Sequence, residues 1–135
     1  MAHPDVKTEA QARTRIEADT QTFLNAFDYQ AELGVFTTTW AIYKEIPLAR
    51  FREAVPQEDR MVLPGMEIPI DVAHVAIQTF GAVWEDLLRV AVGFGGRQLY
   101  RLVRKRALEA GAPRDLAGKL ADFFTKRFAK SGQSP

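Results

Sequence analysis

The sequence predicts an all-α fold: a single compact helical bundle of five or six helices with one irregular loop near residues 57–70. Apolar residues recur at steps of three or four in every segment except 61–69, and strand-like alternation is nearly absent. The 135 residues, 47% of them hydrophobic, are enough for one domain that buries about two thirds of its unfolded surface. We therefore expect one helical domain over 1–135, with residues 1–6 and 131–135 disordered.

The N-terminal part predicts a long amphipathic helix. Pro4 suits a first helical turn, and neither Gly nor Pro follows it before Gly34. The apolar stripe of this helix keeps helical spacing and consists of Ile16, Thr20, Phe23, Phe27 and Ala31. We expect an amphipathic helix that is closed by Gly34. Residues 7–15 carry little apolar surface, so we expect them to fray or to project into solvent.

Two shorter helices are expected next, followed by a loop. Pro47 removes a backbone donor and clashes with the preceding turn, so a kink or a new helix is expected there. The stripe before it consists of Phe36, Trp40 and Tyr43, and the stripe after it consists of Leu48, Phe51 and Val55. Pro56 ends the second stripe. Residues 57–69 contain Pro64 and Gly65, which suit a type II turn, and we expect an ordered loop packed over the core.

Residues 71–91 predict the central helix of the bundle. Asp71 is a suitable N-cap residue, and most positions after it are apolar. Only a narrow polar face remains, formed by His74, Gln78, Glu85 and Arg89. A helix that is apolar on most sides is usually buried among the others. We therefore expect the core to be centred on Ile77, Phe80, Trp84, Leu87 and Leu88.

Glycines divide the C-terminal third into two helices. The three glycines within residues 93–96 would cost on the order of 3 kcal/mol in a continuous helix, which predicts a turn there. Residues 97–110 resume helical spacing, Gly111 caps this helix, and Pro113 begins the last one. The buried stripe of the last helix is expected to consist of Leu116, Leu120, Phe123, Phe124 and Phe128.

The C-terminal third is also strongly basic. Residues 97–135 contain ten cations and only three anions, a net charge of +7, whereas the whole chain carries +1. Helical spacing places these cations opposite the apolar stripes of both C-terminal helices. Such a face indicates an anionic partner, and partial pairing with the acidic first 96 residues is the alternative explanation. The predicted binding residues are Arg97, Arg101, Arg104, Lys105, Lys119, Lys126 and Lys130.

The same region follows the order of a helix-turn-helix, with a turn at residues 93–96 and an Arg-rich helix at 97–110 that would read DNA. Residues 88–102 resemble the factor-for-inversion type of this motif, and the matching positions are Gly93, Phe94, Leu99, Tyr100 and Arg101. Arg89 departs from the pattern, because the motif has a small residue there for close helix contact. The resemblance implies DNA binding as the alternative function.

Catalytic chemistry is poorly supported by the composition. The chain has no Cys, its only serines are Ser131 and Ser134 in the predicted tail, and its only histidine besides His3 is His74. We therefore expect no catalytic residue, no metal site and no cofactor. A small-ligand pocket or an enzyme site is the third hypothesis, and its residues would be His74, Trp40, Tyr43 and Trp84.

These observations favour a non-catalytic interaction or regulatory module that binds an acidic protein surface. Nucleic acid is the alternative partner, and a homo-oligomer is left open. Membrane association is disfavoured, because phenylalanines at helical spacing usually pack in a core and three charged residues interrupt the most apolar stretch, 72–94. No secretory signal is visible, and the absence of Cys fits a reducing compartment, so we expect a cytoplasmic protein.

Overall fold

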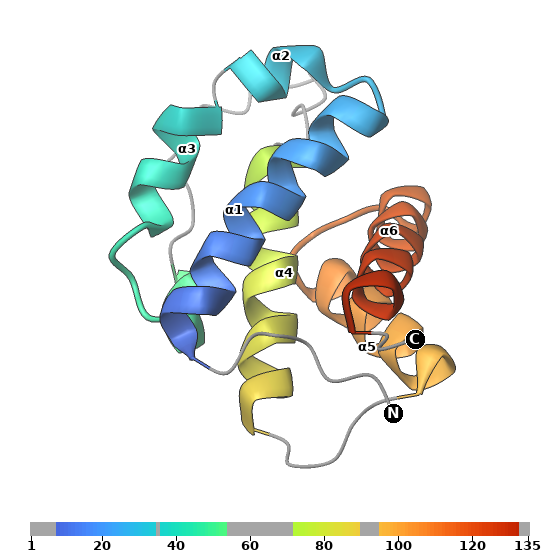
Figure 1. Cartoon of the computed structure of the whole chain (residues 1–135). Helices are drawn as coiled ribbons and strands as arrows, with labels where there is room; N and C mark the ends of the chain where they lie inside the picture. The colour runs from blue at the N-terminus through green and yellow to red at the C-terminus, as the bar shows by residue number, and fades with distance from the viewer. Residues whose placement is uncertain (1–7, 35, 54–71, 90–94, 133–135) are drawn as a thin grey trace.

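The computed structural model describes residues 8–34, 36–53, 72–89 and 95–132, and all regular structure in these residues is helical (Figure 1). The predicted all-α bundle is thus confirmed. The loop expected near residues 57–70 and the N-cap at Asp71 lie outside the described residues. Six α-helices and one 3-10 helix follow one another as α1 Glu9–Ala26, α2 Gln30–Gly34, α3 Phe36–Tyr43, η1 Leu48–Glu53, α4 Val72–Arg89, α5 Gly96–Glu109 and α6 Arg114–Gly132.

Helix α4 is the centre of the bundle, as predicted. It packs against α1, η1 and α5, while α5 and α6 lie side by side as a pair (Figure 1). Three of the predicted central residues are buried, namely Ile77, Phe80 and Trp84. Leu87 and Leu88 are only partly buried, since they lie in the last turns of α4. The core instead continues into α6 through Phe124, whose ring centroid lies 5.6 Å from that of Trp84.

Helix α1 begins and ends at different residues from those predicted. The Thr8 side chain accepts a hydrogen bond from the Gln11 backbone N–H, and the Gln11 side chain accepts one from the Thr8 N–H, both at 3.2 Å. The segment expected to fray is therefore helical from Glu9 onward, and Ala12 is buried. The helix stops short of α2 because Asp28 adopts a φ of 63°, a left-handed conformation that Asp tolerates better than most residues.

A new helical element begins after Pro47, as predicted, whereas two residues of the tail that was expected to be disordered are helical. The Pro47 carbonyl accepts a hydrogen bond from the Arg50 N–H at 2.9 Å, and the element that begins here is the 3-10 helix η1. At the other end of the chain, α6 continues to Gly132, so residues 131 and 132 are helical rather than disordered. Phe128 is buried against Trp84, with ring centroids 6.1 Å apart, which holds the end of α6 on the core.

Gly81 lies where α4 meets η1, and we expect Gly81→Ala to lower the free energy of unfolding by about 1 to 3 kcal/mol. The reason is that an added β-carbon would overlap the fully buried ring of Phe51. The matched control is Gly118→Ala in α6, where the nearest atom to the new β-carbon is the Tyr100 hydroxyl at 3.7 Å. That variant should gain up to about 1 kcal/mol from helix propensity. Urea unfolding measures both, and equal stability of the two variants would contradict this packing.

Candidate binding groove on helix α5

Helix α5 is delimited by glycines at both ends, as predicted. Gly95 is the N-cap residue, and its backbone N–H donates to the Gln98 side-chain oxygen at 3.2 Å. After the helix, Gly111 adopts a φ of 99°, the left-handed conformation that glycine favours. Residues 93 and 94 of the predicted turn lie outside the described residues. The side of α5 that faces the bundle consists of Leu99, Val103 and Ala107, all buried.

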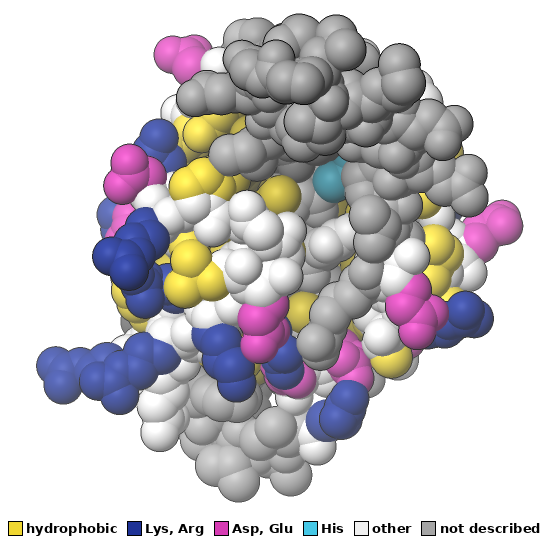
Figure 2. Space-filling model, turned by 180° about the vertical axis from the view of Figure 1, so that it is seen from behind, with side chains coloured by type: hydrophobic (Ala, Val, Ile, Leu, Met, Phe, Trp, Pro, Cys, Tyr) yellow, Lys and Arg dark blue, Asp and Glu magenta, His cyan; other side chains and the backbone are white. Residues whose placement is uncertain are grey.

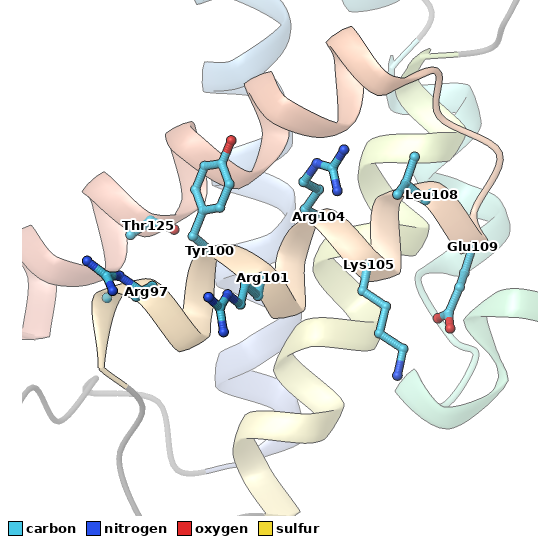
Figure 3. A pocket seen from close by; sticks show the side chains of 9 residues that line it. Arg97, Tyr100, Arg101, Arg104, Lys105, Leu108, Glu109 and Thr125 are labelled. Carbon is cyan, nitrogen blue, oxygen red and sulfur yellow. The ribbon is translucent and has the colours of Figure 1, made fainter.

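The exposed side of α5 borders a groove with a volume of about 840 Å³ (Figure 3). The groove runs along nearly the whole of α5, and Thr125 of α6 also lines it. Most of the lining surface is apolar. All four α5 cations predicted as binding residues line this groove: Arg97, Arg101, Arg104 and Lys105.

The lining residues of α5 form two parallel rows with a spacing of four residues. One row alternates apolar and cationic side chains and consists of Tyr100, Arg104 and Leu108. Tyr100 and Leu108 are 36% and 39% exposed, among the few large apolar side chains that reach the surface of the described residues. The second row has three cations, Arg97, Arg101 and Lys105, and ends at Glu109. Figure 3 shows Tyr100 and Arg104 extending toward α6, while Lys105 points the opposite way.

The four cations have no ion pair within residues 8–34, 36–53, 72–89 and 95–132. Among the described residues, the only carboxylate that lines the groove is Glu109, and it pairs with Arg106 at 2.9 Å. Arg106 also binds Asp86 of α4 at 2.7 Å. Partial burial acts to lower the pKa of Arg106, but the hydrogen bonds and charges of Asp86 and Glu109 outweigh it, so its pKa is raised. The groove therefore keeps an uncompensated positive charge.

Lys119 and Lys126 of α6 do not line this groove. Lys119 lies over the Phe27 ring of α1, with its Nζ 5.8 Å from the ring centroid, and Lys126 pairs with Asp122 at 3.0 Å. The side chain of Lys130 is outside the described part of the chain. The seven predicted cations are thus not gathered at one site. Seen from behind in Figure 2, Lys and Arg side chains are nevertheless most numerous on the side of the molecule where α5 and α6 lie.

The residues of the third predicted site, a ligand pocket, are divided between two regions of the core. The Tyr43 hydroxyl lies 2.7 Å from His74 Nδ1 and accepts a hydrogen bond from Gln78 Nε2 at 3.0 Å. Trp40 stacks on Phe36 in the same region, whereas Trp84 packs against α6. His74 was expected on a polar face, but it is only 6% exposed, because Tyr43 and Gln78 supply polar contacts within the core.

Two further observations limit the chemistry of the described residues. They contain no cluster of three or more His, Cys, Asp or Glu side chains that could hold a metal ion. They also contain no helix with the length and apolar character needed to cross a lipid bilayer.

The described residues include both helices of the region that resembles a helix-turn-helix, but only half of its predicted turn. Helices α4 and α5 pack against each other, and the cationic side of α5 faces outward. Arg89, the residue that departs from the motif, is exposed and forms an ion pair with Glu85 in the preceding turn. Residues 93 and 94, half of the predicted turn, are outside the described residues, so the turn geometry stays a prediction.

Sequence reasoning missed the apolar part of the groove. Tyr100 and Leu108 were not among the predicted binding residues, and neither was Thr125. The available signal was the spacing of Tyr100, Arg104 and Leu108, which places two apolar side chains on the outer side of a helix whose inner stripe is already complete.

The fold and the groove together define an all-helical protein with a basic groove whose lining is mostly apolar. Comparisons with protein-family models, with curated proteins and with solved structures found no match to this chain.

Proposed function

We propose that this protein is a binding module whose groove on α5 takes an acidic segment of a partner protein. The observation that carries the proposal is the set of four cations without an ion partner in the described residues, which line one mainly apolar groove. Three of the four are arginines, whose planar guanidinium groups bind carboxylates bidentately. A carboxylate-bearing ligand would supply the missing countercharge.

The apolar lining favours a protein partner over nucleic acid. A phosphate-binding face needs cations and hydrogen-bond donors, and most of its contacts go to the phosphate and sugar. Tyr100 and Leu108 are exposed between the cations, so a partner that covers them must bring apolar surface as well as negative charge. A protein segment that combines acidic and apolar side chains has both. Binding of DNA is kept as an outcome of the experiment below.

The test is an NMR titration of the ¹⁵N-labelled protein with a short oligo-glutamate peptide and, separately, with duplex DNA. We expect the peptide to shift the amide signals of α5 at low ionic strength. Each exposed charge pair contributes about 0.2 to 1 kcal/mol. Reversing two cations, as in Arg101→Glu with Arg104→Glu, removes attractions and adds repulsions, so the affinity should fall about tenfold or more.

The control for this variant carries the same change in net charge outside the groove. Arg114→Glu with Lys126→Glu alters two exposed cations of α6 that do not line the groove. This variant should bind the peptide within about twofold of the parent protein. Equal losses in both double variants would indicate a general charge effect and would count against the groove. Tighter binding of DNA than of the peptide, with a steep dependence on salt, would favour the nucleic-acid function instead.

A further inference from the structure

We infer that the segment held by the groove is an acidic amphipathic α-helix that lies along α5. This inference rests on the proposed function and specifies the partner's conformation and its pattern of side chains. Three features of the groove support it: the spacing of its exposed apolar residues, the spacing of its cations, and the absence of a sheet edge among the described residues.

The exposed apolar residues of the groove match the repeat of a helix. Tyr100 and Leu108 are eight residues apart, so they are separated by about 12 Å along the axis of α5. Apolar side chains at positions i and i+7 of a partner helix are separated by about 11 Å along its own axis and share one face. A helix of about three turns would therefore place one apolar side chain against Tyr100 and the next against Leu108.

The cationic row has the same repeat. Arg97, Arg101 and Lys105 follow one another at about 6 Å along α5, one helical turn apart. Acidic residues at i, i+4 and i+8 of a partner helix have this spacing and lie beside its apolar face. A single partner helix can thus bring its apolar stripe to Tyr100 and Leu108 and a row of carboxylates to the three cations.

The apolar lining favours a helix over an extended segment. An extended peptide has unpaired backbone N–H and C=O groups, and covering them with apolar surface is costly unless they find partners. Extended peptides usually find these partners at a sheet edge, and the described residues contain no strand. A helix satisfies most of its own backbone hydrogen bonds, so it can lie against the ring of Tyr100 and the side chain of Leu108 at no such cost.

The experiment uses two peptides of identical composition, each about 16 residues long. The first places leucines at i, i+4 and i+7 on one face with glutamates along its edge, and the second is scrambled so that no such face exists. Isothermal titration calorimetry gives both affinities, and circular dichroism measures the helix formed on binding. We expect the first peptide to gain helix when bound and to bind about tenfold more tightly than the scrambled one.

Two variants of the intact protein locate the binding. Leu108→Gln removes an exposed apolar contact and should weaken the first peptide about fivefold while leaving the scrambled peptide unchanged. Ile42→Gln alters another exposed apolar residue, one that does not line the groove, and should change neither affinity.

The outcomes separate this inference from the proposed function. Equal affinities for the two peptides, no gain of helix, or no effect of Leu108→Gln would overturn the helical partner, whereas the binding of acidic segments would stand. If neither peptide binds, and the oligo-glutamate titration also shifts no α5 signal, both proposals are overturned.

Discussion

Replacing Trp84 with alanine is expected to lower the free energy of unfolding by about 3 to 5 kcal/mol. Trp84 is 1% exposed and occupies the junction between the central helix α4 and the last helix α6. Its ring centroid lies 5.6 Å from that of Phe124 and 6.1 Å from that of Phe128. Truncation removes these aromatic contacts and leaves a cavity that the surrounding helices can only partly close.

Denaturant unfolding followed by circular dichroism measures the effect of Trp84→Ala. Trp84→Phe is an informative companion, because the indole Nε1 is buried without a hydrogen-bond partner among the described residues. Phe keeps an aromatic ring and loses no hydrogen bond, so its cost should be smaller than that of alanine. Leu108→Ala, at an exposed position, is the control and should change stability by less than about 1 kcal/mol. A loss of that small size for Trp84→Ala would place the core elsewhere.

Replacing Asp19 with alanine is expected to cost about 3 kcal/mol, the lower end of the range for removing one partner of a buried ion pair. Asp19 is 1% exposed and binds two arginines, with Arg15 Nε at 3.1 Å and Arg127 Nε at 2.7 Å. Its loss would leave two guanidinium groups without their carboxylate. Their side chains are 19% and 38% exposed, so water can hydrate them in part, which is why we expect the lower end.

The matched control for Asp19→Ala is Asp122→Ala, which also removes a carboxylate from an ion pair. The pair of Asp122 with Lys126 is solvent-exposed, with side-chain exposures of 55% and 75%, so its loss should cost no more than about 1 kcal/mol. Urea unfolding compares the two variants. If they lose the same stability, the link that Asp19 forms between α1 and α6 contributes no more than a surface pair does.

The sequence was most informative where glycine and proline delimit the helices. Gly95, Gly111 and Pro113 bound α5 and α6 as expected, because these residues act on the backbone locally. The end of α1 was missed, since Asp28 adopts its left-handed conformation in a stretch without glycine. The network around Asp19 was also not predicted. It joins residues 108 positions apart, and no local pattern indicates such a contact.

Part of the candidate site could be predicted, because helical spacing is also a local property of the sequence. Helical spacing tells which residues of α5 share a side, so four of its five cations could be grouped from the sequence. It does not tell how α6 is rotated about its own axis relative to α5. Lys119 therefore lies over Phe27 of α1 and Lys126 pairs with Asp122, while Thr125 is the α6 residue that reaches the groove. Likewise, the burial of His74 depends on Tyr43, a residue 31 positions away.

The ion pairs of Arg106 connect the packing of two helices with the electric field of the groove. This guanidinium does not line the groove, yet it binds Glu109, which does, and it binds Asp86 of α4 at the same time. Arg106, a residue outside the groove lining, thereby balances the negative charge of Glu109. The electrostatic potential at the groove is thus set partly by the contact between α4 and α5, so a shift of either helix would change this potential.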